Sequence, residues 1–212
     1  MLTFDIITLF PNLFNEHLNA LPFKRAINRG IIKVNFHNLR NYAVDSYGTV
    51  DDKPYGGGTG MILMVEPICK VLDNIPNKQK TILLSPRGNK YNQKKAKEYS
   101  KLSQITLICG RYEGVDARVE EHLTDEIISI GDYVLSGGEI PSLVIMESVV
   151  RLLPGVLEKG DAASKESFEY GLIEHQQYTR PEDFKGMKVP KVLLSGNHKE
   201  IEKWKRQNSF KI

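Results

Sequence analysis

The stretch SIGDYVLSGGEIP (residues 129–141) begins as an alternating, strand-like run and then places glycines at positions 131, 137 and 138. Glycine costs backbone entropy and leaves no side chain to pack, so its repeated use indicates backbone that something approaches closely. Two further glycine-marked turns, CGRYEGVD (109–116) and LLSPRG (83–88), also follow or interrupt apolar runs. Ligands bind outside the carboxyl ends of strands in open α/β sheets. We therefore expect the three loops to converge on one pocket.

Short β-rich runs alternate with helical patterns along the chain. Strands are expected at residues 4–10, 31–39, 80–86, 104–110 and 126–137, and helices at 61–75, 91–102, 140–157 and 197–210. Strands separated by helices predict an α/β fold with a largely parallel sheet covered on both faces. The helix at 140–157 is expected to be the most buried, and a dimer contact is a further role for it. Its apolar residues are Leu143, Ile145, Met146, Val149, Val150, Leu152 and Leu153.

The composition predicts a globular protein with one core, either alone or with a small appendage, because 41% of the 212 residues are apolar and 26% are charged. No apolar run approaches the ~18 residues of a membrane helix, and the first residues lack a positively charged start. A cytoplasmic location without membrane association is therefore expected. Cys69 and Cys109 lie among apolar neighbours and are expected to be small buried hydrophobes, with a disulfide as the alternative. The lysine-rich segment after residue 184 is expected to meet an anion such as nucleic acid.

The glycine-marked loops contain neither of the phosphate-binding patterns GxxxxGK(S/T) and GxGxxG, which disfavours a polyphosphate ligand. Their exposed backbone suits a flat heterocycle with hydrogen-bonding edges and a positive charge. The side chains that they offer are Tyr112, Glu113, Ile130, Asp132, Tyr133, Val134, Leu135 and Glu139. The alternative, that these glycines only serve tight turns, stays open. The run DDKPYGGGTGM (51–61) is either a lid or RNA contact, or a plain surface loop.

Six motifs in order, GGGTGM, SPRG, CGRYEGVDARV, SIGDYVLSGGEIP, QYTRP and VLLSGNHKEIEKW, together span nearly the whole chain. They closely resemble those of the bacterial tRNA (guanine-N1)-methyltransferases, the TrmD family of the SPOUT class. The resemblance implies a parallel-sheet α/β fold with a C-terminal trefoil knot and a small, mainly helical C-terminal domain. It also implies a homodimer with its active sites at the subunit interface. The reaction it implies is methyl transfer from S-adenosylmethionine to N1 of guanosine 37, beside the anticodon of tRNA.

The resemblance divides the chain into three parts. Residues 1–157 would form the knotted, S-adenosylmethionine-binding catalytic domain, 158–177 the linker and active-site loop, and 178–212 a basic tRNA-binding domain. The bent methyl donor would be held by the three glycine-marked loops. The residues implied are Leu84, Ser85, Pro86, Gly110, Tyr112, Glu113, Ser129, Ile130, Gly131, Tyr133, Leu135, Gly137, Gly138 and Pro141.

Catalysis needs a group that removes the N1 proton of guanine and a group that steadies the charge developing on the base. In the family an Asp-Ser-Phe motif supplies the base, and the matching residue here is Glu166, with Asp161 as the alternative. The longer glutamate must still come within hydrogen-bond reach of the proton. Arg151 is expected as its partner, because its permanently charged, planar guanidinium can bind O6 of guanine or hold the carboxylate in place. Without the resemblance, Arg151 would be interpreted as an ordinary surface ion pair.

Arg180, His198, Lys203 and Lys205 resemble RNA-gripping residues of the family and would supply phosphate contacts. No HExxH or CxxC pattern is present, so no metal ligands are expected. The magnesium dependence implied by the family would enter through the RNA or near the carboxylate. Three alternatives to the tRNA enzyme remain: a SPOUT methyltransferase for another nucleoside, an RNA-binding relative without catalysis, and a generic nucleotide-binding α/β protein.

Overall fold

The computed structural model describes residues 1–157, 167–168 and 172–211. The chain divides into two compact units, residues 1–158 and residues 159–212. Each unit is described by itself below.

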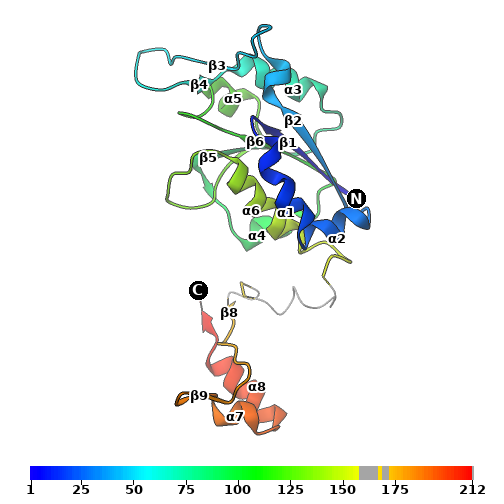
Figure 1. The fold of residues 1–212 in the computed structure, drawn as a ribbon, viewed down its shortest axis with the longest axis vertical. Helices are drawn as coiled ribbons and strands as arrows, with labels where there is room; N and C mark the ends of the chain where they lie inside the picture. Colours follow the sequence, from blue (N-terminus) through cyan, green and yellow to red (C-terminus); the bar gives the residue numbers. More distant parts are fainter. Residues whose placement is uncertain (158–166, 169–171, 212) are drawn as a thin grey trace. The chain divides into compact units, whose positions relative to one another are not determined.

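The first unit is built around a five-stranded sheet with the strand order β2-β1-β6-β5-β7 (Figure 1). All four neighbouring pairs of this sheet are parallel. The expectation of a largely parallel sheet is therefore confirmed. The strands are β1 (Leu2–Thr8), β2 (Ile32–Asn38), β5 (Thr81–Lys90), β6 (Gln104–Cys109) and β7 (Glu126–Ser129). A short antiparallel pair, β3 (Asp51–Asp52) with β4 (Ile62–Leu63), lies outside this sheet.

Helices cover both faces of the sheet, as Figure 1 shows with α3 and α5 on one side and α1, α2, α4 and α6 on the other. The helices of the first unit are η1 (Pro11–Phe14), α1 (Asn15–Asn19), α2 (Phe23–Asn28), η2 (Leu39–Tyr42), α3 (Val65–Asn74), α4 (Gln93–Tyr99), α5 (Ala117–His122) and α6 (Glu139–Val150). Each face has its own apolar core, because successive side chains of a strand point to opposite faces. Thus Ile6 and Leu107 pack in the core under α6, whereas Ile7 and Ile108 pack in the core under α3.

Most of helix α6 is buried, as expected for the apolar run after residue 140, and an exposed stripe remains at Ile140 and Val144. Ile145, Met146, Val149 and Val150 are all fully buried. The helix is shorter than predicted, because it ends at Val150 and Leu152 lies in the turn that follows. Its buried surface joins the core formed by β1, β6 and α4.

Three other sequence predictions need correction. The strand expected at 126–137 ends at Ser129, because the Ser129 hydroxyl donates to the Gly131 carbonyl and turns the chain. The helix expected at 61–75 begins only at Val65, since Ile62 and Leu63 pair with β3 instead. Cys69 is only partly buried, with its thiol 3.7 Å from Asp73 Oδ2, whereas Cys109 is fully buried, and both are free thiols.

A buried polar cluster lies in the middle of the sheet. Asp5 on β1 is 4% exposed and accepts hydrogen bonds from Asn35 Nδ2 and Gln104 Nε2, both at 2.9 Å. His37 Nε2 lies 2.8 Å from the same carboxylate. Burial opposes the charged carboxylate, but the hydrogen bonds from these neighbours outweigh it and lower the pKa of Asp5.

The described residues of the second unit form two helices and two short antiparallel strand pairs. Its elements are β8 (Leu172–Ile173), β9 (Asp183–Phe184), β10 (Met187–Lys188), α7 (Lys191–Leu194), α8 (His198–Gln207) and β11 (Phe210–Lys211). Strand β8 pairs with β11, and β9 pairs with β10. Trp204 on α8 packs edge-on against the rings of His175 and Tyr178, at centroid distances of 5.7 Å and 6.3 Å.

Candidate functional site

A cavity of about 340 Å³ lies where the carboxyl ends of β5, β6 and β7 meet. These strands are neighbours in the sheet, so the loops that follow β6 and β7 and the bulge inside β5 lie together. The cavity size falls at the lower end of the range for small-molecule sites. Every residue that the family resemblance implied for the methyl-donor pocket lines this single cavity: Leu84, Ser85, Pro86, Gly110, Tyr112, Glu113, Ser129, Ile130, Gly131, Tyr133, Leu135, Gly137, Gly138 and Pro141.

Several lining residues were not expected from the sequence. They are Leu83, Arg87, Arg111, Gly114, Val115, Glu120, Ile128 and Ser136. The charged ones change the electrostatics of the site, because Arg87 and Glu120 face each other at 3.8 Å. Arg111 and Arg87 stand in the loops that the sequence had singled out, but nothing in their local sequence distinguishes them from solvent-exposed arginines.

The glycines of the third loop allow it to lie in close contact with the second pocket loop. Gly138 N donates to Gly110 O at 2.9 Å, and Arg111 forms an isolated antiparallel bridge with Gly137. A Cβ added to Gly138 would lie 2.6 Å from Cys109 Cα. The backbone of 137–138 is therefore pressed against the end of β6, and a side chain at Gly138 would force the two apart.

Exposed aromatic and aliphatic groups form the mouth of the cavity. Tyr112 and Tyr133 are 49% and 54% exposed, and Val134 is 85% exposed. Tyr112 has a φ of 59°, a left-handed conformation that is uncommon for a residue with a side chain. Such outliers concentrate at functional sites because the surrounding structure must hold them. The Tyr133 hydroxyl donates to Ile130 O at 3.3 Å.

The three carboxylates expected to face the ligand have different surroundings. Glu113 lines the cavity. Asp132 does not line the cavity and forms an ion pair with Lys90 at 2.5 Å on the surface. Glu139 is 1% exposed and lies beneath the loops rather than in the cavity wall. Of the three, Glu113 alone is placed to meet a positively charged ligand.

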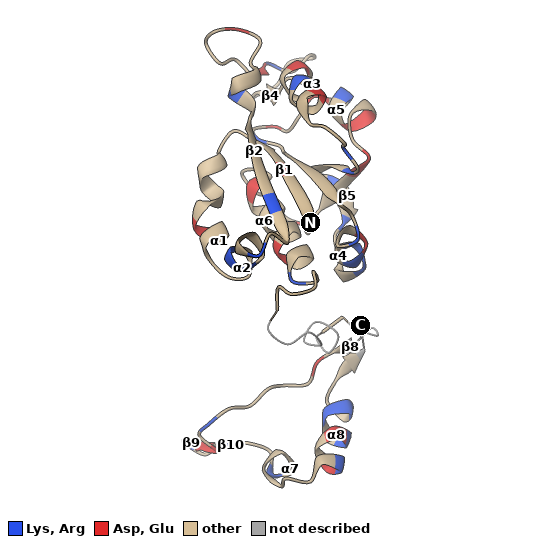
Figure 2. Ribbon diagram, turned by 90° about the vertical axis from the view of Figure 1, so that its right-hand side faces the viewer, with Lys and Arg blue, Asp and Glu red and all other residues tan. Residues whose placement is uncertain are grey.

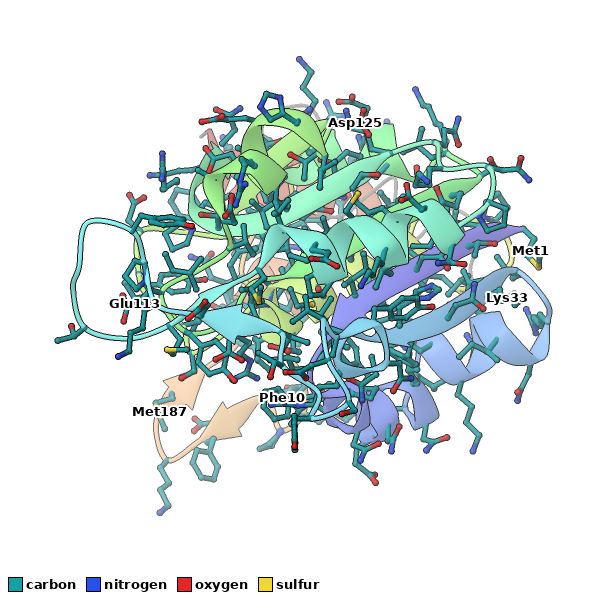
Figure 3. All side chains as sticks on the ribbon, turned by 90° about the horizontal axis from the view of Figure 1, so that it is seen from above. Met1, Phe10, Lys33, Glu113, Asp125 and Met187 are labelled. Carbon is teal, nitrogen blue, oxygen red and sulfur yellow. The ribbon has the colours of Figure 1, made fainter. Side chains whose placement is uncertain are left out.

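The glycine-rich loop between β3 and β4 adjoins the second pocket loop. Glu113 N donates to Met61 O at 3.0 Å, and Leu63 N donates to Gly114 O at the same distance. A Cβ added to Gly60 would lie 2.6 Å from Glu113 Cγ. Figure 3 shows Glu113 beside this loop. The loop thus lies against the pocket segment, as a lid or RNA contact requires.

The thiol of Cys109 lies behind the cavity, fully buried and 3.1 Å from Ser142 Oγ. Burial raises the pKa of Cys109 far above that of a free thiol. The Cys109 thiol is therefore unreactive, and its side chain serves only to fill the core. Among the described residues, no group of three His, Cys, Asp or Glu side chains could hold a metal ion.

Arg151, one of the two expected catalytic residues, does not line this cavity. Arg151 caps the carboxyl end of α6, while Pro141 at the other end of the helix lines the cavity. Ten residues of α-helix separate them, which is about 15 Å along the helix axis. Glu166 and its alternative, Asp161, lie outside the described residues.

The expected RNA-binding residues lie in the second unit. Arg180 is exposed before Pro181, and His198 begins α8, which Asn197 caps by accepting from Glu200 N at 3.4 Å. Lys203 is exposed, whereas Lys205 is half-buried and paired with Glu202 at 2.9 Å.

Helical spacing places two further basic residues on the face of Lys203. Lys199 and Arg206 lie four residues before it and three after it, and both are exposed. Both belong to the basic segment after residue 184 but were not among the individual residues expected to bind RNA. Figure 2 shows the basic residues along α8.

Together the fold and the site define an α/β protein whose ligand pocket is made by three glycine-containing loops at the carboxyl edge of a parallel sheet. No described helix is long and apolar enough to cross a membrane.

Comparison with known proteins shows the family to which the chain belongs. The family model for tRNA (guanine-1)-methyltransferase TrmD matches residues 2–211, so the chain belongs to this family. A tRNA (guanine-N(1)-)-methyltransferase of Dictyoglomus turgidum is 50% identical over 212 residues, which cover 100% of this chain and 86% of the relative. The one from Carboxydothermus hydrogenoformans is 51% identical over 207 residues, covering 97% and 82%. The crystal structure of tRNA (m1G37) methyltransferase from Aquifex aeolicus has a TM-score of 0.81 and 42% identity, covering 96% of this chain and 87% of that one.

Proposed function

We propose that this protein transfers a methyl group from S-adenosylmethionine to N1 of guanosine 37 in tRNA. Membership of the tRNA (guanine-1)-methyltransferase family over residues 2–211 supports the reaction class. The observation that carries the proposal is the convergence of all three glycine-marked loops on one cavity. The preference for N1 of guanine and for position 37 follows the relatives' names, and a cytoplasmic location follows from the tRNA substrate.

The cavity suits S-adenosylmethionine chemically. Its walls combine backbone edges at Gly110 and Gly137, the aromatic rings of Tyr112 and Tyr133, and the carboxylate of Glu113. These groups match an adenine with hydrogen-bonding edges and a positively charged methionine moiety, without a phosphate cradle. When bound, S-adenosylmethionine supplies an electrophilic methyl group on a sulfonium. The protein would hold that group still, and positioning of this kind supplies up to roughly 7–11 kcal/mol of a barrier.

The proton and the charge of the acceptor base must be handled by other residues. Glu166 would accept the N1 proton of guanine, as the matching aspartate is expected to do in the family. The N1 lone pair then forms the new bond to the methyl carbon, and the electrons of the broken carbon–sulfur bond stay on sulfur. Arg151 would bind O6 of guanine and stabilise the negative charge that develops there.

The position of Arg151 favours a site shared between two subunits. About 15 Å of helix separates it from the cavity of its own chain, which is too far for direct contact with the transferred methyl group. An exposed apolar stripe on the same helix supplies a surface for a second copy: Ile140 and Val144 are 51% and 42% exposed. Leu13, on the neighbouring η1, is 48% exposed. A homodimer that buries these side chains would bring the partner's Arg151 towards the cavity.

The family's trefoil knot is also part of the proposal. Its support is a close crossing of backbones, because a Cβ added to Gly88 would lie 2.5 Å from Ile127 C and Ile128 N. The segment after the bulge of β5 therefore passes directly against β7, where a threaded chain would cross. In the second unit, the basic face of α8 would bind tRNA phosphates. Magnesium has no assigned residue.

The test is methyl transfer from labelled S-adenosylmethionine to two unmodified tRNA transcripts, one with guanosine and one with adenosine at position 37. We expect transfer to the guanosine transcript only. Glu166→Gln should abolish it by removing the base, and Glu166→Asp should retain it as the matched control. Arg151→Lys should lower kcat while donor binding persists.

Each other outcome points to a named alternative. Transfer to a different nucleoside would indicate another SPOUT specificity. Donor binding without transfer to any RNA would indicate an RNA-binding relative that has lost catalysis. Thermal protection by ATP or NAD but not by S-adenosylmethionine would indicate a generic nucleotide-binding protein. Full activity in Glu166→Gln would leave the enzyme in place and refute the assigned base.

A further inference from the structure

A carboxylate lies buried directly behind the cavity. Glu139, the first residue of α6, is 1% exposed. Its Oε1 accepts from the Thr8 hydroxyl at 2.7 Å, and its Oε2 accepts from Arg111 Nε at 2.9 Å. A charge at this depth is tolerated only when it is paired and hydrogen-bonded. Glu139 does not line the cavity, so it acts through the groups that it holds.

The guanidinium of Arg111 makes several contacts at once. Besides Glu139, its Nη1 donates to Ser136 O at 3.2 Å, and its Cζ lies 4.5 Å from the ring centroid of Phe10. A Cβ added to Gly137 would overlap Arg111 Nε, so the third loop is packed directly against this side chain. One side chain from the second pocket loop thus contacts the third loop, the start of α6 and the end of β1.

We propose that Arg111 and Glu139 are positioning residues for the methyl-donor pocket, a role that rests on the proposed function of that pocket. The pair fixes the second pocket loop, which carries Tyr112 and Glu113, against the third loop, which carries Tyr133. Both loops must be in place together for one ligand to contact them. Loss of the pair therefore weakens donor binding, whereas the tRNA contacts proposed on α8 are in a separate unit.

The geometry requires arginine and not just a positive charge. The Nε of Arg111 donates to the carboxylate of Glu139 while its Nη1 donates to the Ser136 carbonyl, so two different nitrogens of the planar guanidinium are used. The three donors of a lysine ammonium share one nitrogen, which cannot occupy both positions at once. Arg111→Lys keeps the charge that compensates Glu139 and removes the link to the third loop.

Arg118 provides a matched control on the same segment. Its Nε and Nη2 bind Asp116 at 2.8 Å and 2.6 Å, and neither residue lines the cavity. Arg118→Lys therefore disrupts a comparable ion pair without touching the third loop. Glu139→Gln is a second test variant: its amide can accept from Arg111 and donate to the Thr8 hydroxyl, so the fold is retained while the charge is lost.

The experiment measures S-adenosylmethionine and S-adenosylhomocysteine binding by calorimetry on the full chain, together with steady-state kinetics. We expect the Kd of both ligands to rise about tenfold or more in Arg111→Lys and at least about threefold in Glu139→Gln. Arg118→Lys should stay within about twofold of wild type. The KM for the donor should rise, while the KM for tRNA and kcat at saturating donor stay near wild type. A purely structural role would not separate these constants in this way.

The outcomes separate this inference from the proposed function. Wild-type protein that binds neither donor nor product would refute the proposed function itself. The positioning role would be overturned if Arg111→Lys bound the methyl donor with the affinity of wild type. If the lysine variant does not fold, wild-type donor affinity in Glu139→Gln would overturn it. A fall in kcat with an unchanged donor KM would also overturn it.

Discussion

A single methyl group added at Gly138 should push two of the pocket loops apart. Gly138 has φ −82° and ψ −3°, an ordinary right-handed conformation that alanine adopts freely. Only space forbids a side chain, because its Cβ would lie 2.6 Å from Cys109 Cα, 3.0 Å from Gly110 N and 3.1 Å from Cys109 C. All three neighbours are backbone atoms, so no side-chain rotation relieves the contact.

The size of the effect follows from the required displacement. Ordinary contact at about 3.4 Å requires the start of α6 to retreat by about 0.8 Å from the end of β6, across the hydrogen bond from Gly138 N to Gly110 O at 2.9 Å. Overpacking of this kind costs roughly 1–3 kcal/mol. At about 2–4 °C per kcal/mol for a protein of this size, Gly138→Ala should unfold roughly 6 °C lower than wild type. The misplaced loop should weaken donor binding by about a hundredfold.

The assays are thermal unfolding and calorimetric titration with S-adenosylmethionine. Gly110→Ala is the matched control for stability, because its Cβ would meet only Leu84 O at 3.6 Å and Val115 Cγ1 at 3.8 Å. That variant should unfold near the wild-type temperature. The reasoning is refuted if Gly138→Ala keeps both the stability and the donor affinity of wild type, or if the two alanine variants are equally destabilised.

Two further predictions concern charge. Since hydrogen bonds lower the pKa of Asp5 despite its burial, its carboxylate stabilises the fold above the ordinary aspartate pKa of about 3.9, and this stability is lost as pH falls through the lower folded pKa. Asp5→Asn should therefore lower the free energy of unfolding, measured with urea at pH 7, by about 1–3 kcal/mol. The difference in unfolding free energy between wild type and variant should become smaller in acid, and a difference that does not vary with pH would contradict this. On α8, Lys203→Ala should weaken tRNA binding and make the log–log salt slope about 0.7–0.9 less negative, whereas Lys205→Ala should change it less because Lys205 is paired with Glu202. Equal slopes in filter-binding titrations of the two variants would refute the assignment of the binding face.

The parallel sheet could be predicted because its strands are continuous apolar runs separated by helical patterns. β6, for example, is buried at all six positions. The strand order could not be predicted, since β1 pairs with β2 on one side and with the distant β6 on the other. Such long-range pairing depends on packing between helices and both faces of the sheet, which no local pattern encodes. The overlong strand after Glu126 has a local cause, because the alternation continues through Tyr133 although the backbone turns at Gly131.

The pocket could be predicted in more detail than the fold, because glycines in the sequence mark its three loops. The charged groups were harder to place. Glu139 and Glu113 look equivalent in sequence, yet one begins a buried helix and the other lies in the cavity wall. Arg111 was missed because an arginine in a turn usually extends into solvent, and its partners are distant in sequence: Phe10 lies shortly after β1, and Glu139 is 28 residues further along than Arg111.

The glycines of the third loop allow its backbone to pack closely against other parts of the chain, and this packing does not depend on a ligand. Gly138 is required where α6 meets β6, and Gly88 is required where the bulge of β5 lies against its neighbouring strand β7. These contacts exist within the chain alone, so the loops hold their relative positions before any ligand is bound. In a pocket whose loops are already fixed, little of the binding free energy is lost in ordering those loops. The glycines that seemed to mark ligand contact therefore act mainly by allowing the chain to pack against itself, and the ligand then meets edges that are already fixed.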